Sequence, residues 1–312
     1  MTTANAEIPA FIDAHHHFWD LDRNPYPWLQ GETVHDFRYG SYEALQRNYL
    51  PDDFAADTRG YAPMATVHIE AEWDRGTPVD ETRWLATLAQ RYQRPSVVVA
   101  HANLGAADTR QVLAAQAAFD MVRGIRHKPV VAARIGDFCR GEPGSMDDMR
   151  WRDGYALLQQ YGLSFDLQAP WWHLEQAQEL ARDFPATPLI LNHTGLPSDR
   201  CAQGLAGWRK ALEALAQVPN TALKISGLGQ RNTPWSAEAN IPVIREAIAI
   251  FGADRCMFAS NFPVDSLVTS YPAIVSAFAQ AIAPLASAQQ QALWAGNAAR
   301  IYRIKADSPA RD

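Results

Sequence analysis

Short apolar runs alternate along the chain with longer stretches in which apolar residues recur every three to four positions. Runs of this length, rich in β-branched residues and bounded by polar residues, are typical of strands buried in a parallel sheet. The longer stretches place their apolar residues on one helical face, as Leu205, Trp208, Leu212 and Leu215 do. The pattern predicts eight strands, at residues 11–14, 65–70, 96–101, 122–127, 163–168, 188–192, 222–226 and 256–260.

The stretches between these strands predict helices at residues 43–57, 80–92, 108–119, 149–161, 174–184, 204–217, 241–251 and 267–281, with a last helix at 288–302. Eight β-α units that close on themselves form an α/β fold, the (β/α)8 TIM barrel. A doubly wound open sheet is less favoured, because no Gly-x-Gly-x-x-Gly follows the first strand. We therefore expect one domain over residues 8–304, with flexible tails at 1–7 and 305–312.

Residues 19–42 form a long connection after the first strand that is rich in proline, aromatic and charged residues. It is too irregular to predict a helix, and we expect it to fold over the mouth of the barrel as a substrate loop.

The first strand runs directly into His15, His16 and His17. Successive strand residues face opposite sides, so His15 and His17 share a face, with Cα atoms about 6.6 Å apart. Two imidazoles at that separation can converge on one ion or on one substrate oxygen. Two simpler explanations of the three histidines are a polar strand end and a remnant of an affinity tag. However, the histidines follow a strand-like run and do not form a homogeneous terminal tract.

Polar residues also end the other strands, and in TIM barrels the active site lies at these carboxyl ends. Arg126 suits either a substrate carboxylate or an internal salt bridge. Glu70 could belong to a site or form an ion pair with an arginine on the rim of the barrel. A lone histidine such as His127 more often forms hydrogen bonds with backbone groups than it acts in a site. The strand-end residues considered for a site are Glu70, Arg126, His127, Gln168, Trp171, His193, Asn261 and Asp265.

The composition narrows the class of protein. The chain has 312 residues and a net charge of −6, without a run of basic residues, which disfavours nucleic acid and anionic membranes as partners. No apolar run has the length of a membrane span, and the first seven residues lack the features of a signal peptide. Three widely spaced cysteines fit a reducing cytoplasm. We expect a cytoplasmic protein that acts on a small molecule, and homo-oligomerisation is left open.

Five motifs along the chain resemble the amidohydrolase superfamily, in the branch called amidohydrolase 2. This TIM-barrel group includes sugar-acid lactonases and the 2-pyrone-4,6-dicarboxylate lactonase. The resemblance extends over residues 11–302. The motifs are Asp13-Ala14-His15-His16-His17-Phe18-Trp19-Asp20, Val122-Arg123-Gly124-Ile125-Arg126, Ile190-Leu191-Asn192-His193-Thr194-Gly195, Lys224-Ile225-Ser226-Gly227 and Met257-Phe258-Ala259-Ser260-Asn261-Phe262-Pro263-Val264-Asp265.

The resemblance implies a site for a divalent metal, or a metal-free polar site, made by the first-strand histidine pair, a sixth-strand histidine and an eighth-strand Asp. His15, His17 and His193 match these positions as catalytic residues and metal ligands, and Asn261 stands where many members have Asp. Asn cannot take a proton from water at neutral pH. Lys128 lies beyond its strand beside a proline, which disfavours a two-metal site. The resemblance thus leaves one Zn²⁺, or no metal.

The resemblance implies a hydrolase that opens a lactone of a sugar acid or related carboxylated ring by attack of water. The histidines would polarise the carbonyl, and Asp265 or Glu70 would take the proton that Asn261 cannot. Substrate binding would fall to the four remaining strand-end residues, Arg126, His127, Gln168 and Trp171. The alternatives are a metal-dependent non-oxidative decarboxylase of an aromatic or unsaturated acid, and a barrel that binds a sugar acid without turning it over.

Overall fold

The computed structural model describes residues 8–31 and 37–305 and contains one parallel eight-stranded sheet in sequential order. The seam between the last and first strands is closed by backbone bonds from the Asn261 N–H to the His15 carbonyl (2.7 Å) and from the His17 N–H to the Phe262 carbonyl (2.8 Å). The predicted (β/α)8 barrel is confirmed. Its strands are β1 (Ile12–His16), β2 (Ala65–Ile69), β3 (Val97–His101), β4 (Val122–Arg126), β5 (Ser164–Leu167), β6 (Leu189–Leu191), β7 (Thr221–Ile225) and β8 (Cys256–Phe258).

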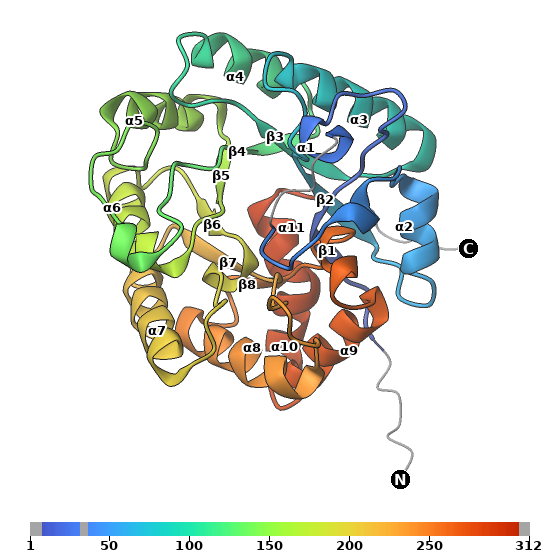
Figure 1. Cartoon of the computed structure of the whole chain (residues 1–312). Coiled ribbons are helices and arrows are strands. Elements are labelled where there is room, and N and C mark those ends of the chain that lie inside the picture. Colours follow the sequence, from blue (N-terminus) through green and yellow to red (C-terminus); the bar gives the residue numbers. More distant parts are fainter. Residues whose placement is uncertain (1–7, 32–36, 306–312) are drawn as a thin grey trace.

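Helices surround the barrel as an outer ring (Figure 1). Side chains cap several of them: Asp148, Ser236 and Ser270 each accept a backbone N–H at a helix N-terminus. The helices are α1 (Pro27–Gln30), α2 (Pro51–Asp57), α3 (Pro78–Tyr92), α4 (Thr109–Ala117), α5 (Met149–Ala156), α6 (Leu174–Asp183), α7 (Ala202–Ala216), α8 (Ala237–Phe251), α9 (Tyr271–Ile282), α10 (Ser287–Gln291) and α11 (Asn297–Ile301).

Several predicted helices differ from those observed. Helix α8 begins at Ala237, four residues earlier than expected, and the helix expected at 149–161 ends at Ala156 and is followed by a 3-10 turn, η3 (Leu158–Tyr161). The single helix expected at 43–57 was wrong: a 3-10 turn, η1 (Glu43–Leu45), precedes α2, which begins at Pro51, because proline fits the first helical turn and not the middle of a helix. The last helix is interrupted by a π-helical turn at Ala292–Gly296. Helix α9 begins four residues later than expected, behind the Ser270 cap.

The interior of the barrel is filled by small and branched apolar side chains and closed at its amino end by the last helix. Ala298 of α11 and Tyr302 pack against this inner cluster. Tyr302 also donates to the Asp166 carboxylate (3.0 Å), whose other partner is Lys224 at 2.5 Å. Lys224 therefore forms an ion pair in the core of the barrel, and all three side chains are fully buried.

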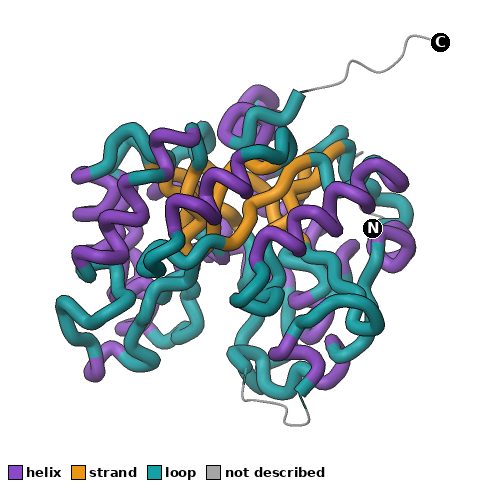
Figure 2. Tube along the Cα trace, turned by 90° about the horizontal axis from the view of Figure 1, so that it is seen from above, coloured by secondary structure: helices purple, strands orange, loops and turns teal. Residues whose placement is uncertain are grey.

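The long connection after β1 lies at the opposite, carboxyl end of the strands, where the loops gather (Figure 2). It contains the short helix α1, so the expectation that it has no helix was wrong. The Trp28 indole N–H donates to the Ala71 carbonyl beyond β2 (2.9 Å), and Trp19 pairs with Tyr49. Residues 32–36 lie outside the described part. No helix among the described residues is long and apolar enough to cross a membrane.

Candidate active site

A bulge in β1 turns the two predicted histidines towards the mouth of the barrel. The pairing of β1 with β2 shifts register between Asp13 and His16. Of the two residues in between, Ala14 packs in the inner apolar cluster and His15 is fully buried. The His15 and His17 Nε2 atoms approach to 3.3 Å. The His17 Nδ1 is 2.8 Å from the Ile69 carbonyl, an acceptor only, so Nδ1 carries the proton and Nε2 presents its lone pair.

His193 joins this pair from the end of β6, its ring centroid 4.6 Å from that of His15. Its backbone is left-handed (φ +54°), an arrangement that costs energy in a non-glycine residue and is common at functional sites. Its Nδ1 lies 3.1 Å from the Ser226 hydroxyl oxygen. Gly227 packs against the same ring, and a Cβ there would stand 2.6 Å from the His193 Cβ. The β6 and β7 termini therefore fix His193 from behind.

Burial lowers the pKa of all three histidines well below the usual range, and nearby cations lower it further. The foremost charged neighbour is Lys224 for His15, Arg126 for His17 and Arg38 for His193. All three imidazoles are consequently neutral at pH 7, the form that ligates metals and accepts protons.

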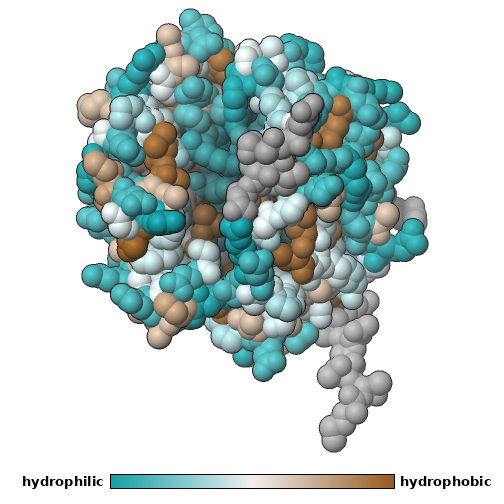
Figure 3. Space-filling view, in the orientation of Figure 1, coloured by the Kyte–Doolittle hydropathy of each residue, from teal (hydrophilic) through white to brown (hydrophobic). Residues whose placement is uncertain are grey.

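His17 and His193 open onto a cavity of about 190 Å³ at the mouth of the barrel. The face that carries it is hollowed near its middle (Figure 3). One wall is aromatic, made by Trp19, Trp28 and Phe37 from the long connection. This confirms that the described part of the connection lies over the mouth. The remaining lining residues are Arg38, Ala71, Glu72, Arg126, Lys128, Gln168, Asn261 and Val264.

Arg126 forms the internal salt bridge that was one of its two expectations. Its Nε donates to Glu70 Oε1 at 2.7 Å and its Nη2 to the Glu70 carbonyl. Arg75 binds Glu70 Oε2 at 3.0 Å. Burial would raise the pKa of Glu70, but these two guanidinium groups hold it well below its usual range. The Arg126 Nη1 lies 3.4 Å from Gln168 Oε1, and both residues line the cavity; substrate binding by them stays a prediction.

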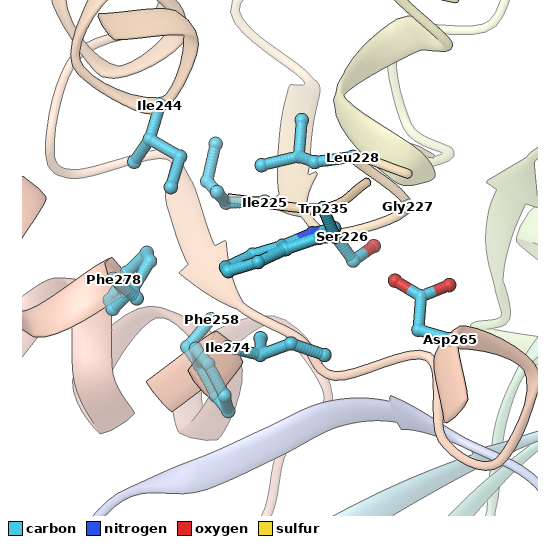
Figure 4. Close-up of a pocket in the computed structure, with 10 residues that line it drawn as sticks. All are labelled: Ile225, Ser226, Gly227, Leu228, Trp235, Ile244, Phe258, Asp265, Ile274 and Phe278. Carbon is cyan, nitrogen blue, oxygen red and sulfur yellow. The ribbon is translucent and has the colours of Figure 1, made fainter. Parts of the chain in front are cut away.

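Asn261 and Asp265 lie together at the end of β8. Asn261 has φ +59°, which Asn tolerates better than most residues, and its Nδ2 donates to Asp265 Oδ1 at 2.6 Å. The Tyr39 hydroxyl donates to the same oxygen at 3.0 Å. Burial raises the pKa of Asp265. Asn261 lines the mouth cavity, whereas Asp265 stands behind it, its carboxylate directed towards Ser226 and Gly227 beside a small apolar pocket (Figure 4).

Two predicted substrate-binding residues lie away from this cavity. The His127 Nδ1 accepts the Trp151 indole N–H (3.0 Å) and the Leu104 N–H (3.1 Å), and His127 is absent from the cavity lining. Trp171 packs on Gly207 of α7 and lines a separate groove on the outside of the barrel. The structure therefore does not bring His127 or Trp171 to the histidines.

Sequence reasoning did not single out Trp28, Phe37, Arg38 or Tyr39. All four lie on the long connection, where their positions relative to β8 depend on the path of an irregular loop. The abundance of aromatic residues in that stretch was the available signal.

The histidines fit a metal ion, although no group of three or more His, Cys, Asp or Glu residues in the described part of the chain is arranged to hold one as it stands. Two ligands at 2.0–2.1 Å from a tetrahedral zinc ion lie about 3.3 Å apart, the separation of the His15 and His17 Nε2 atoms. Outer partners, Ile69 for His17 and Ser226 for His193, fix the rings as they do around zinc-bound histidines.

Comparison with known proteins places this chain in a family. An uncharacterized protein y4mH of Sinorhizobium fredii is 41% identical over 295 residues, which cover 95% of this chain and 99% of that protein. An L-fucono-1,5-lactonase of Burkholderia multivorans is 30% identical, with 96% and 98% covered. The crystal structure of an amidohydrolase from Burkholderia multivorans with bound zinc has a TM-score of 0.77 at 29% identity, with 95% and 100% covered. The family model described as amidohydrolase matches residues 12–304, and the chain belongs to this family of enzymes.

Proposed function

We propose that the chain hydrolyses a sugar-acid lactone by attack of water at the mouth of the barrel. The observation that carries the proposal is the cluster of three neutral histidines beneath a cavity with one aromatic wall and one polar wall. The similarity to an L-fucono-1,5-lactonase supports the same reaction class. Aromatic faces suit the apolar C–H surfaces of a sugar ring, and the polar wall suits its hydroxyl groups.

Hydrolysis requires a group that polarises the lactone carbonyl. His15, His17 and His193 would hold a zinc ion, which when bound polarises a carbonyl and lowers the pKa of water. The His15 and His17 Nε2 atoms lie 3.3 Å apart, and the Ile69 carbonyl and the Ser226 hydroxyl hold the rings of His17 and His193. Because these side chains are fixed before the substrate arrives, little reorganisation is needed as negative charge develops on the carbonyl oxygen.

A second group must take the proton of the attacking water, and we assign this role to Asp265 in preference to Glu70. Both Glu70 oxygens face guanidinium groups, which makes its carboxylate a weak base. Asp265 has a raised pKa, and its Oδ1 accepts a hydrogen bond from the Nδ2 of Asn261, which lines the cavity. Asn261 orients this carboxylate and presents its own amide to the cavity.

The test is the turnover of a panel of aldonic acid lactones, followed by base uptake at constant pH. Replacement His193→Ala should abolish turnover. His173→Ala serves as the control, because this histidine lies at η4 (Trp171–His173) and does not line the cavity. Carbon dioxide release from aromatic acids, measured in parallel, distinguishes a decarboxylase. Undiminished lactone hydrolysis by His193→Ala would refute the proposal.

A further inference from the structure

The cavity at the mouth of the barrel carries an excess of positive charge. Four charged side chains line it, and three more are joined to these by ion pairs. Together they comprise four cations and three carboxylates. The cations are Arg38, Arg75, Arg126 and Lys128, and the carboxylates are Glu70, Glu72 and Asp265.

Most of these cations already have a close carboxylate partner. Arg126 is bonded to Glu70 through its Nε and its Nη2. Lys128 is paired with Glu72, and Arg75 contacts both acids. These residues therefore balance one another on the side of the cavity formed by β2 and β4.

Arg38, on the long connection after β1, is the exception. Its Nε and Nη1 atoms are buried and have no hydrogen-bond partner among residues 8–31 and 37–305. Its Nη2 is 3.8 Å from Asp265 Oδ1, too far for a hydrogen bond. The guanidinium lies over the Tyr39 ring at 4.6 Å, and the Arg38 side chain, which is 22% exposed, lines the cavity.

Buried guanidinium donors without partners are costly, and a ligand that accepts from them recovers that energy. A carboxylate matches the planar fork of arginine with two parallel bonds. The single excess positive charge fits one additional negative charge. Arg38 is also the foremost charged neighbour of His193, so a group bound by Arg38 lies close to the catalytic cluster.

We propose that Arg38 binds a carboxylate carried by the substrate, and that the preferred substrate is therefore a lactone with a free carboxylate substituent rather than a neutral aldonolactone. This inference rests on the proposed lactone hydrolysis. In the bound substrate the lactone carbonyl meets His15, His17 and His193, and the substituent meets Arg38. Trp19 and Trp28 would cover the ring between them.

The test compares lactone pairs that differ only in a carboxylate or a hydroxymethyl group, namely the aldaric and aldonic 1,4-lactones of the gluco, galacto and manno series. The parent should have a higher kcat/KM for the aldaric member. Arg38→Gln should raise KM for the aldaric member about 10- to 100-fold more than for the neutral member, the equivalent of one charge-assisted pair. Arg38→Lys keeps the positive charge but not the planar guanidinium, so its KM for the aldaric member should lie between those of the parent and Arg38→Gln.

The control is Arg47→Gln, which removes the same charge from an exposed arginine that does not line the cavity. A second arm measures binding of glucarate, galactarate and mannarate against gluconate, galactonate and mannonate by calorimetry, so it does not depend on turnover. Tighter binding of diacids that disappears in Arg38→Gln supports the inference. Equal binding of diacids and monoacids, or equal loss of both lactone types in Arg38→Gln, overturns it. If no lactone is turned over but diacids still bind more tightly than monoacids, the proposed hydrolysis is refuted and the carboxylate site is not.

Discussion

Replacing Gly227 by alanine should displace His193 without removing any functional group. The new Cβ would stand 2.6 Å from the His193 Cβ, 2.8 Å from its Cγ and 3.0 Å from its Nδ1. Ordinary contact begins at 3.4 Å, so the imidazole must move by about 0.8 Å. A misplacement of about 1 Å in a catalytic group can reduce the rate about 100-fold. We expect kcat to fall by about that factor.

The same substitution has a second effect that must be separated from the first. Gly227 has φ +65°, and an alanine in this left-handed conformation costs about 1–2 kcal/mol. Gly162 provides a matched control, because it has φ +62° and a Cβ there meets nothing within 4 Å. Gly162→Ala should lose about the same stability and keep full activity.

Two assays distinguish these effects. Urea unfolding gives the free energy of unfolding of each variant, and lactone hydrolysis gives kcat and KM. We expect both alanine variants to be destabilised, with the kcat loss confined to Gly227→Ala. If Gly227→Ala retained the kcat of the parent, the exact position of His193 would not matter, and the assignment of this histidine to the reaction would be refuted.

Three further outcomes are expected. Asn261→Asp should lower activity at least about 10-fold at pH 7, because two carboxylates would meet where Asn261 Nδ2 now lies 2.6 Å from Asp265; a gain in turnover would contradict this. Burial raises the pKa of Glu81 to about 8 in the folded protein. Between the pKa of the unfolded chain and about 8, the folded state therefore holds a proton that the unfolded state has lost, and the free energy of unfolding falls as pH rises through this range. Glu81→Gln should therefore gain at least about 1.4 kcal/mol relative to the parent between pH 5 and pH 8.5, measured by urea unfolding; a pH-independent difference would exclude this cause. Zinc added to chelator-treated protein should raise the Tm by several degrees, and His15→Ala and His17→Ala should abolish the rise; an unchanged Tm in the parent would argue against a zinc site.

The sequence predicted the strands well because each is a short apolar run that the core requires to be buried. It predicted the placement of His15, His17 and His193 at one mouth because parallel strands bring their carboxyl ends together. Helix boundaries were less predictable where a proline, as at Pro51, decides the start. A single proline ends or starts a helix within a stretch whose apolar pattern otherwise continues, so the pattern alone does not locate the boundary.

Other parts of the site depend on contacts between distant residues. The pairing of Arg126 with Glu70 joins positions 56 residues apart, so the sequence left a substrate carboxylate and a salt bridge as equal alternatives. Arg38 reaches Asp265 through a connection without regular periodicity. The pattern of strand ends also suggested Trp171, which turns outward because Gly207 leaves space for its indole ring. Side-chain direction beyond a strand end is set by such packing and not by spacing along the chain.

Asn261 stands where the family resemblance led us to expect an acid, but a carboxylate lies beside it. Asp265 follows within the turn η6 (Val264–Leu267), and its backbone N–H bonds the Asn261 carbonyl at 3.0 Å. That turn places the two side chains in contact, so an acid at both positions would bring like charges together. With Asn261 as donor and Tyr39 as a second donor, the single carboxylate is oriented, and Arg38 lies near it. A barrel that binds its ligand without turning it over would not require a carboxylate oriented by two donors. The oriented Asp265 therefore favours a catalytic site over a binding site.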